Sequence, residues 1–289
     1  MFKGCFVAIV TPFREGEIDE DNFRGLIQFQ LEKGIDGIVP CGTTGESATL
    51  SHEEHKKLIR ITVEEVRGKV PVIAGTGSNS TKEAEELTIY AKEIGADAAL
   101  VVAPYYNKPT QKGLKEHYEK LAKIGLPIII YNIPSRTGIN ILPSTVAALS
   151  KNKNIVGIKE ASGNMDQVSQ IVLSSEPDFA VLSGDDSLTL PILALGGVGV
   201  ISVLANILPQ EVTQMVKAWL EGDVERAREL HYRLFPLFKA MFIETNPIPV
   251  KTAMAKLNMI PKEWRMPLGE MEKENEEKLE KILSEQGLL

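Results

Sequence analysis

The sequence predicts an α/β protein, a closed (β/α)₈ TIM barrel followed by a C-terminal helical extension. Three observations lead to this fold class. Eight short apolar runs rich in valine and isoleucine recur between Gly4 and Val203, and stretches of helical periodicity separate them. The starts of successive runs lie about 19–33 residues apart, which is the length that a strand and its crossover helix need.

Most of the eight runs are continuously apolar, which is typical of strands buried on both faces of a parallel sheet. A doubly wound open sheet is the alternative. The dinucleotide fingerprint that such a sheet often carries is missing, because Ser80 stands where a third glycine should follow Gly75 and Gly77. The expected strands are residues 4–10, 37–40, 70–75, 98–103, 127–132, 155–160, 179–183 and 198–203.

The stretches between the strands carry helix signals. Two capping boxes are predicted at residues 51–54 and 80–83, where a serine precedes a glutamate by three positions, and Asp19 and Thr110 are expected N-caps. The expected helices are residues 20–33, 52–67, 81–94, 111–124, 144–150, 165–174, 187–195 and 210–220.

Strand patterns stop after residue 222, and helical sequence takes over. One helix is expected over residues 223–242 with a kink at Pro236, a rigid turn at 246–249 opens a second, and a third covers 270–284. We therefore expect a catalytic barrel over residues 1–222 and a helical domain over 223–289, packed on the barrel or on a neighbouring subunit.

Composition limits the classes of function. A net charge of −7 argues against nucleic acid or an anionic membrane as partner. Two cysteines form no disulfide framework, no apolar stretch reaches membrane-spanning length, and the first apolar run is too short for a secretory signal, so we expect a cytoplasmic protein. Four scattered histidines make a metal-dependent aldolase a poor fit, and no metal is expected.

The most informative element is the strand at 155–160, which runs from apolar residues into Lys159 and Glu160. Alternation places Gly157 beneath Lys159 on the same face, leaving room for a long side chain. A buried lysine loses the hydration that stabilises its charged form, and the usual use of such a residue is a neutral amine that attacks a carbonyl to give a Schiff base. The alternative is a lysine that reaches water or pairs with Glu160.

Chemistry in a barrel gathers where the strands end. The loop at 42–47 has two glycines around Thr43 and Thr44, so its backbone N–H groups could form a nest for a carboxylate, although such a sequence is also an ordinary turn. Tyr131 should point into the barrel beside Lys159 and can move protons, and Arg136 offers a planar fork for a substrate carboxylate. A satisfied core tyrosine and a surface salt bridge are the respective alternatives.

Two other strand ends give weaker signals. Tyr105 and Tyr106 are adjacent, so they face different surfaces, and packing at an interface would explain both. Asp185 and Asp186 follow the seventh strand, where many barrel enzymes bind phosphate. Their charge indicates a substrate without phosphate.

Four stretches, at residues 42–46, 131–138, 157–160 and 246–251, resemble the dihydrodipicolinate synthase family of the pyruvate-dependent class I aldolase superfamily. The resemblance extends over the whole chain. It implies condensation of pyruvate with L-aspartate-4-semialdehyde to 4-hydroxy-tetrahydrodipicolinate in lysine biosynthesis. The arginine at 136 favours this reaction over its nearest alternative, pyruvate-releasing cleavage of a sialic acid or a 2-keto-3-deoxy sugar acid.

The resemblance also implies a role for each matching residue. Lys159 forms the Schiff base, with no separate cofactor, and Tyr131, Thr43 and Tyr106 form a proton relay in which Tyr106 comes from an adjacent subunit of a homotetramer. The implied substrate-binding residues are Thr44 for pyruvate, Arg136 for the semialdehyde carboxylate, and Gly184 and Ile201 through their backbones.

A second site follows from the same resemblance. Feedback lysine in regulated members binds at a subunit interface, and the matching positions here are Ser47, Ala48, His52, His55, Asn79, Glu83 and Tyr105. Helix capping by Ser47 and Glu83 is the simpler interpretation of two of them. A non-catalytic sensor that binds lysine or a keto acid is a further alternative, which predicts no covalent adduct.

Overall fold

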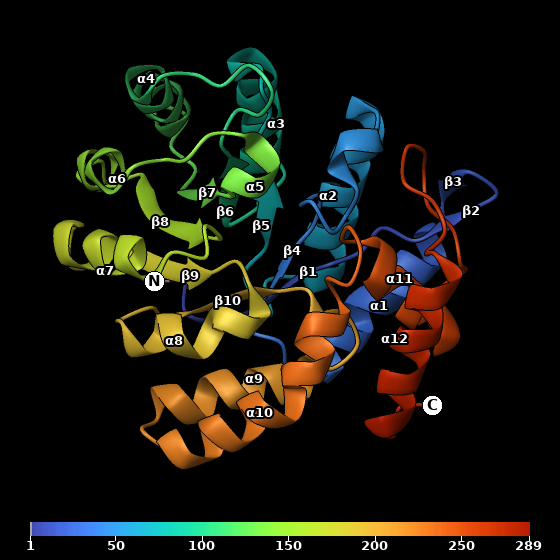
Figure 1. Ribbon diagram of the computed structural model, residues 1–289. Coiled ribbons are helices and arrows are strands. Elements are labelled where there is room, and N and C mark those ends of the chain that lie inside the picture. The colour runs from blue at the N-terminus through green and yellow to red at the C-terminus, as the bar shows by residue number, and fades with distance from the viewer. Residues whose placement is uncertain (1) are drawn as a thin grey trace.

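Eight parallel strands form the centre of the molecule in the computed structural model, which describes residues 2–289 (Figure 1). Their order in the sheet is β4-β1-β10-β9-β8-β7-β6-β5, and a bridge between Ile38 and Val72 joins the two ends. The predicted TIM barrel is therefore confirmed. The strands are β1 (Gly4–Ala8), β4 (Gly37–Val39), β5 (Ile73–Gly75), β6 (Ala98–Val102), β7 (Ile128–Asn132), β8 (Ile155–Glu160), β9 (Ala180–Ser183) and β10 (Gly199–Ser202).

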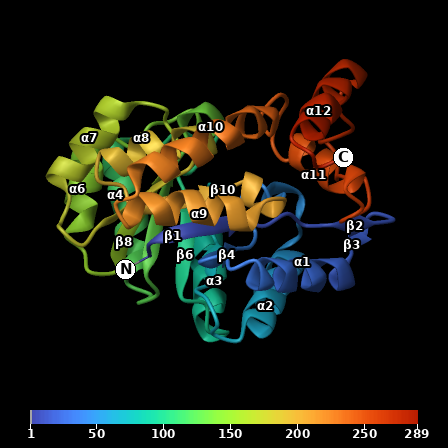
Figure 2. The same cartoon turned by 90° about the horizontal axis from the view of Figure 1, so that it is seen from below.

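Helices surround the barrel, as the view from below shows (Figure 2). The helices of the barrel are α1 (Glu20–Glu32), α2 (His52–Val66), α3 (Thr81–Glu93), α4 (Gln111–Ala122), α5 (Pro134–Thr137), α6 (Pro143–Ser150), α7 (Met165–Ser174), α8 (Thr189–Ala194) and α9 (Pro209–Leu220). Three short elements were not predicted, because they contain too few residues for a periodic pattern. They are the hairpin of β2 (Phe13–Arg14) and β3 (Glu17–Ile18), and α5.

All four helices begin where they were predicted, and three of the four predicted side-chain caps are correct. Ser51 and Glu54 form the capping box of α2, and the side chains of Asp19 and Thr110 cap α1 and α4. The box predicted at residues 80–83 is wrong. The carboxylate of Glu83 instead accepts a hydrogen bond from the Ser78 hydroxyl at 2.7 Å, and that hydroxyl also accepts from the Ser80 N–H.

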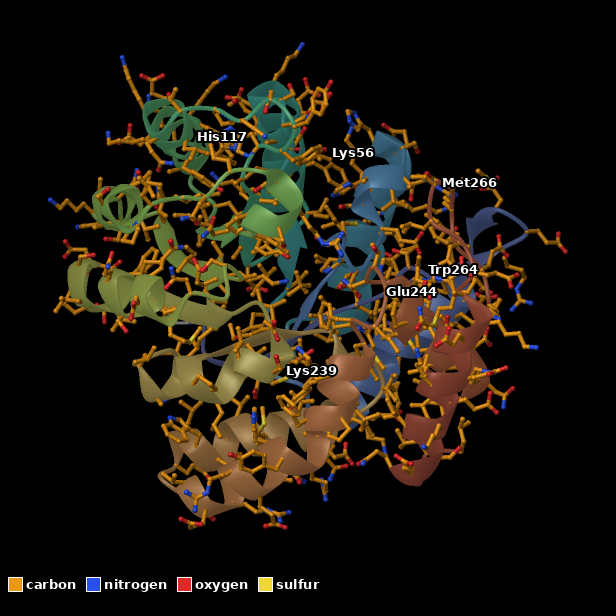
Figure 3. All side chains as sticks on the ribbon, viewed as in Figure 1. Lys56, His117, Lys239, Glu244, Trp264 and Met266 are labelled. Carbon is orange, nitrogen blue, oxygen red and sulfur yellow. The ribbon has the colours of Figure 1, made fainter. Side chains whose placement is uncertain are left out.

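The C-terminal segment contributes α10 (Val224–Ala240), α11 (Ile248–Lys256) and α12 (Lys273–Glu285). Helix α10, with Pro236 inside it, packs along α9, and α11 contacts the barrel at the 3₁₀ turn Leu204–Asn206 (Figures 1 and 2). Trp264 and Met266 lie on the segment between α11 and α12, near the β2–β3 hairpin (Figure 3). We propose that residues 223–289 are a helical domain fused to the barrel of residues 1–222.

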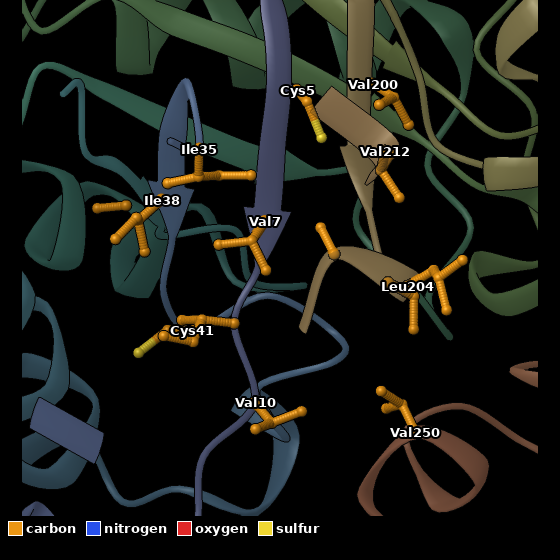
Figure 4. Packing of buried hydrophobic residues seen from close by; sticks show 14 of the residues in the cluster. Cys5, Val7, Val10, Ile35, Ile38, Cys41, Val200, Leu204, Val212 and Val250 are labelled. Atoms are coloured by element: carbon orange, nitrogen blue, oxygen red, sulfur yellow. The ribbon is translucent and has the colours of Figure 1, made fainter. Parts of the chain in front are cut away.

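The buried apolar side chains form two clusters because successive residues of a strand point to opposite faces. One lies inside the barrel and includes Phe6, Ile129, Tyr131 and Ile201. The other lies between the strands and the helices. Val250 of α11 shares this outer cluster with Val10 and Leu204 (Figure 4), so the C-terminal segment packs into the same core as the barrel. Among residues 2–289, no helix is long and apolar enough to cross a membrane.

Candidate active site

Lys159 and Tyr131 lie side by side inside the barrel. They occupy paired positions on β8 and β7, and each is 5% exposed. The Nζ atom of Lys159 lies 4.3 Å from the centroid of the Tyr131 ring. The structure therefore brings a buried amine next to a phenol at the carboxyl ends of two neighbouring strands, where barrel enzymes place their chemistry.

The space for the Lys159 side chain comes from Gly184. A Cβ atom added there would lie 3.2 Å from Cε of Lys159 and 2.7 Å from Cβ of Ala161, so a larger residue would push the amine aside. The expectation that Gly157 supplies this space is wrong. A Cβ on Gly157 would meet the carbonyl oxygen of Ala180 at 2.6 Å, so the next strand fills that position.

The residues after Tyr131 and Lys159 point outward and hold the two strand ends together. Asn132 Nδ2 donates to the Glu160 carboxylate at 3.0 Å, and Gln167 Nε2 and the Ser162 N–H donate to it at 3.3 and 2.7 Å. The alternative in which Lys159 pairs with Glu160 is wrong, because amides hold this carboxylate on the far side of the sheet. The sequence analysis did not identify Asn132, although it directly follows Tyr131.

The loop after β4 offers fewer free N–H groups than expected. The N–H groups of residues 45–47 donate to the carbonyls of Gly42 and Thr43 at 3.1–3.3 Å, so they stabilise the turn itself. Within residues 2–289, the N–H groups of Gly42, Thr43 and Thr44 have no backbone acceptor outside regular elements. The loop can therefore receive a carboxylate at residues 42–44, a narrower nest than the sequence suggested.

Asn246, from the turn before α11, joins two of the predicted residues. Its Nδ2 donates to Thr44 Oγ1 at 3.0 Å, and its carbonyl accepts from Arg136 Nη2 at 2.9 Å. Asn246 is 5% exposed, whereas Arg136, in the short helix after β7, is exposed. The sequence analysis recognised the turn at 246–249 but gave Asn246 no place in the site.

The other predicted residues differ in their position. Ile201 is buried in the barrel interior. Tyr106 is 89% exposed with φ of 72°, whereas Lys159 is buried inside the barrel. Asp185 caps the turn that begins at Asp186, and buried Asp186 accepts from two backbone N–H groups after β10. Burial raises the pKa of Asp186, and this carboxyl group serves the structure rather than a ligand.

Two cavities open at this end of the barrel. One of about 360 Å³ lies over the strand ends and is lined by Ile133, Arg136, Ala161 and Gly184, among others. The other, of about 430 Å³, extends from Thr43 and Arg136 toward α2 and α3. Arg136 lines both, so it stands at the boundary between the two spaces.

Most of the predicted effector residues gather in the larger cavity. Its lining includes Ser47, Ala48, His52, His55, Glu83 and Tyr105. Asn79 is not among the lining residues, and its carbonyl accepts from the Asn107 side chain at 2.8 Å. Burial lowers the pKa of His55, and its Nε2 donates to the Gly75 carbonyl at 2.6 Å, which leaves Nδ1 as the acceptor atom of the neutral ring.

The fold and this arrangement define a class, the (β/α)₈-barrel enzymes, whose reacting groups lie at the carboxyl ends of the strands. The sequence model of the Dihydrodipicolinate synthetase family matches residues 1–286. The 4-hydroxy-tetrahydrodipicolinate synthases of Syntrophus aciditrophicus and Thermodesulfovibrio yellowstonii are each 58% identical over 290 residues, with all of both chains covered. The chain belongs to the dihydrodipicolinate synthase family.

Solved structures agree with this assignment. The dihydrodipicolinate synthase of Aquifex aeolicus is 55% identical, with a TM-score of 0.98 and 99% of each chain covered. A lysine-bound structure from Cyanidioschyzon merolae is 43% identical, with a TM-score of 0.97 and coverage of 100% of this chain and 99% of that one. A structure from Acinetobacter baumannii, complexed with pyruvate, is 40% identical, with a TM-score of 0.97 and both chains fully covered.

Proposed function

We propose that the chain condenses pyruvate with L-aspartate-4-semialdehyde to 4-hydroxy-tetrahydrodipicolinate, the first committed step of lysine biosynthesis through diaminopimelate. The observation that carries the reaction type is the buried amine of Lys159, 4.3 Å from the centroid of the Tyr131 ring. The choice of substrates rests on membership of the family, in which relatives are 58% identical over their full length.

The chemistry follows from a nucleophilic amine. Lys159 attacks the keto carbon of pyruvate, and loss of water gives a Schiff base, so no separate cofactor is needed. Loss of a methyl proton gives an enamine, whose carbon forms a bond to the aldehyde carbon of the semialdehyde. The amino group of the semialdehyde then attacks the imine, closes the ring and releases Lys159.

The protons need a carrier, and Tyr131 lies where one is required. Its phenol can protonate the departing hydroxyl during imine formation and take up protons in later steps. Thr43 and Tyr106 extend the relay toward solvent. Because Tyr106 is 89% exposed in its own chain while Lys159 is buried, this role requires that Tyr106 come from the neighbouring subunit of a homotetramer.

Different residues bind the carboxylates of the two substrates. The free N–H groups of Thr43 and Thr44 receive that of pyruvate, and the backbones of Gly184 and Ile201 line the pocket. The exposed guanidinium of Arg136, fixed through Asn246 at 2.9 Å, binds the carboxylate of the semialdehyde.

A panel assay tests this function. We expect product formation from pyruvate and L-aspartate-4-semialdehyde, and no pyruvate release from N-acetylneuraminate or 2-keto-3-deoxygluconate. Arg136→Ala should raise KM for the semialdehyde by about 10- to 100-fold, because a charged hydrogen-bonding partner is lost, with KM for pyruvate nearly unchanged. Cleavage of a sugar acid as the faster reaction would replace the proposed function, and an equal effect on both KM values would refute the role of Arg136.

We further propose that L-lysine inhibits the enzyme at the larger cavity. The lining offers a carboxylate, Glu83, for an ammonium group, and hydroxyls and a neutral imidazole for the rest of an amino acid. Thr43 lines the same cavity, so an occupant there is one loop away from the Schiff-base site. Asn79 belongs to the lysine-binding residues only if assembly of the subunits brings it to the larger cavity.

The inhibition is tested with L-lysine at millimolar concentration, with L-norleucine as a ligand that has the same carbon chain without the terminal ammonium. Lysine should lower the rate and bind in calorimetry, and norleucine should do neither. Glu83→Gln should weaken inhibition about tenfold or more, since a charged partner is lost. Glu86→Gln, on the exposed face of the same helix, is the control. An unchanged rate without calorimetric heat rules the effector site out.

A further inference from the structure

We propose that Lys251 of α11 is a positioning residue, which acts through Glu46 to hold the Thr43–Thr44 loop in the shape that receives pyruvate. The inference rests on the proposed function of this loop. It assigns a part in substrate binding to α11, a helix that lies outside the barrel.

Lys251 and Glu46 form an ion pair in which both side chains are fully buried. The Nζ atom lies 2.5 Å from Glu46 Oε1 and donates to the Thr11 carbonyl at 2.9 Å. It also lies 4.4 Å from the centroid of the Phe13 ring. Burial lowers the pKa of Lys251 while Glu46 opposes this shift. A pair without solvent has only one good arrangement, so the ammonium fixes the position of the carboxylate.

The backbone of Glu46 transmits this position to the substrate loop. Its N–H donates to the Thr43 carbonyl at 3.1 Å, and its own carbonyl accepts from the Thr49 hydroxyl at 3.0 Å. Glu46 has φ of 56°, a left-handed conformation that residues other than glycine rarely adopt without support. The carboxylate, held by Lys251 and by the Arg265 N–H at 3.2 Å, provides that support.

A second set of contacts places the same two segments together. Thr11, whose carbonyl binds Lys251, donates its hydroxyl to the Gly45 carbonyl at 2.7 Å. Asn246, five positions before Lys251, donates to Thr44 Oγ1 at 3.0 Å. The loop is thus tied on both sides of its turn to the segment that carries α11.

A purely structural role for the pair makes a different prediction. Removal of one buried charge destabilises a protein because the other charge is left unpaired, whereas replacement of both charges is often neutral for stability. The double variant Glu46→Gln with Lys251→Met therefore distinguishes an effect on stability from an effect on substrate binding. A structural pair requires that kinetics recover together with stability, and a positioning pair requires that binding stays impaired.

The experiment measures borohydride trapping of pyruvate on the full-length double variant, together with its melting temperature and steady-state kinetics. We expect a melting temperature close to that of the unaltered enzyme and complete trapping at saturating pyruvate. The pyruvate concentration for half-maximal trapping should rise about tenfold or more, because a displaced loop binds the carboxylate less well. KM for pyruvate should rise in parallel, with kcat changed far less.

Lys256→Met is the matched control, since Lys256 is on the same helix and pairs at 3.0 Å with Glu276, away from the loop. Its pyruvate dependence should match that of the unaltered enzyme. Half-maximal trapping of the double variant at an unchanged pyruvate concentration overturns the inference. So does a rise in that concentration in the Lys256 variant. Failure of the unaltered enzyme to trap pyruvate would instead refute the proposed function.

Discussion

Lys159→Ala abolishes the covalent adduct that pyruvate forms with the enzyme under borohydride. Intact mass and peptide mapping should place the reduced pyruvyl group of the unaltered enzyme on Lys159 alone. The rate of condensation should fall by at least about 10³-fold in the variant, because the nucleophile that divides the reaction into two easier steps is gone. No other side chain at the carboxyl ends of β7 and β8 offers an amine.

The control for this variant is Lys153→Ala, which removes an exposed lysine from the turn just before β8. It should leave both trapping and rate unchanged. Circular dichroism of the Lys159 variant should show the full helix content, because only a side chain inside the barrel is shortened. An adduct that still forms on the Lys159 variant, or maps to another lysine, would falsify the Schiff-base mechanism.

Tyr131→Phe slows turnover by about 10²- to 10⁴-fold, which is the usual contribution of a positioned proton carrier. The ring that lies beside the amine remains, so packing inside the barrel is kept and only the hydroxyl is lost. Adduct formation with pyruvate should still reach completion, but more slowly. Single-turnover kinetics with borohydride quenching measures both effects.

Tyr118→Phe provides a matched loss of a buried hydroxyl outside the barrel. Tyr118 of α4 is fully buried and donates to the Val101 carbonyl at 3.0 Å. Its replacement should cost about 1 kcal/mol of unfolding free energy and leave kcat unchanged. Equal rate losses in the two variants would show that the Tyr131 hydroxyl stabilises the barrel and carries no proton.

The strands and most helices were predictable because burial imposes its own period on the sequence. Buried β8 was predicted to its last residue, since its apolar run ends where Lys159 and Glu160 begin. The hairpin after β1 was not predicted. Its strands are two residues long, so no alternation exists to read. The capping box at Ser80 failed because Ser78, two residues earlier, competes for the same glutamate.

The candidate site was predictable where strand alternation and neighbouring strands decide the geometry. Tyr131 and Lys159 follow from two adjacent strands with a common register. The contacts of Asn246 and the role of Gly184 in making room for Lys159 did not follow from the sequence, for different reasons. Asn246 reaches Thr44 across 202 positions of the chain, a distance that no local pattern records. The need for a glycine at 184 depends on where the lysine stem lies, which only the packed barrel shows.

The buried pair of Glu46 and Lys251 also has a consequence for folding of the chain during its synthesis on the ribosome. The two residues are separated by 205 positions, and a ribosome adds about 5–20 residues per second. Lys251 is therefore synthesised roughly 10–40 s after Glu46, and the ion pair cannot form before then. Until Lys251 leaves the exit tunnel, closure of the barrel around the Glu46 carboxylate would bury an unpaired charge. We therefore expect the loop after β4 to stay open in the nascent chain, and the last compaction of the barrel to follow only at the end of translation.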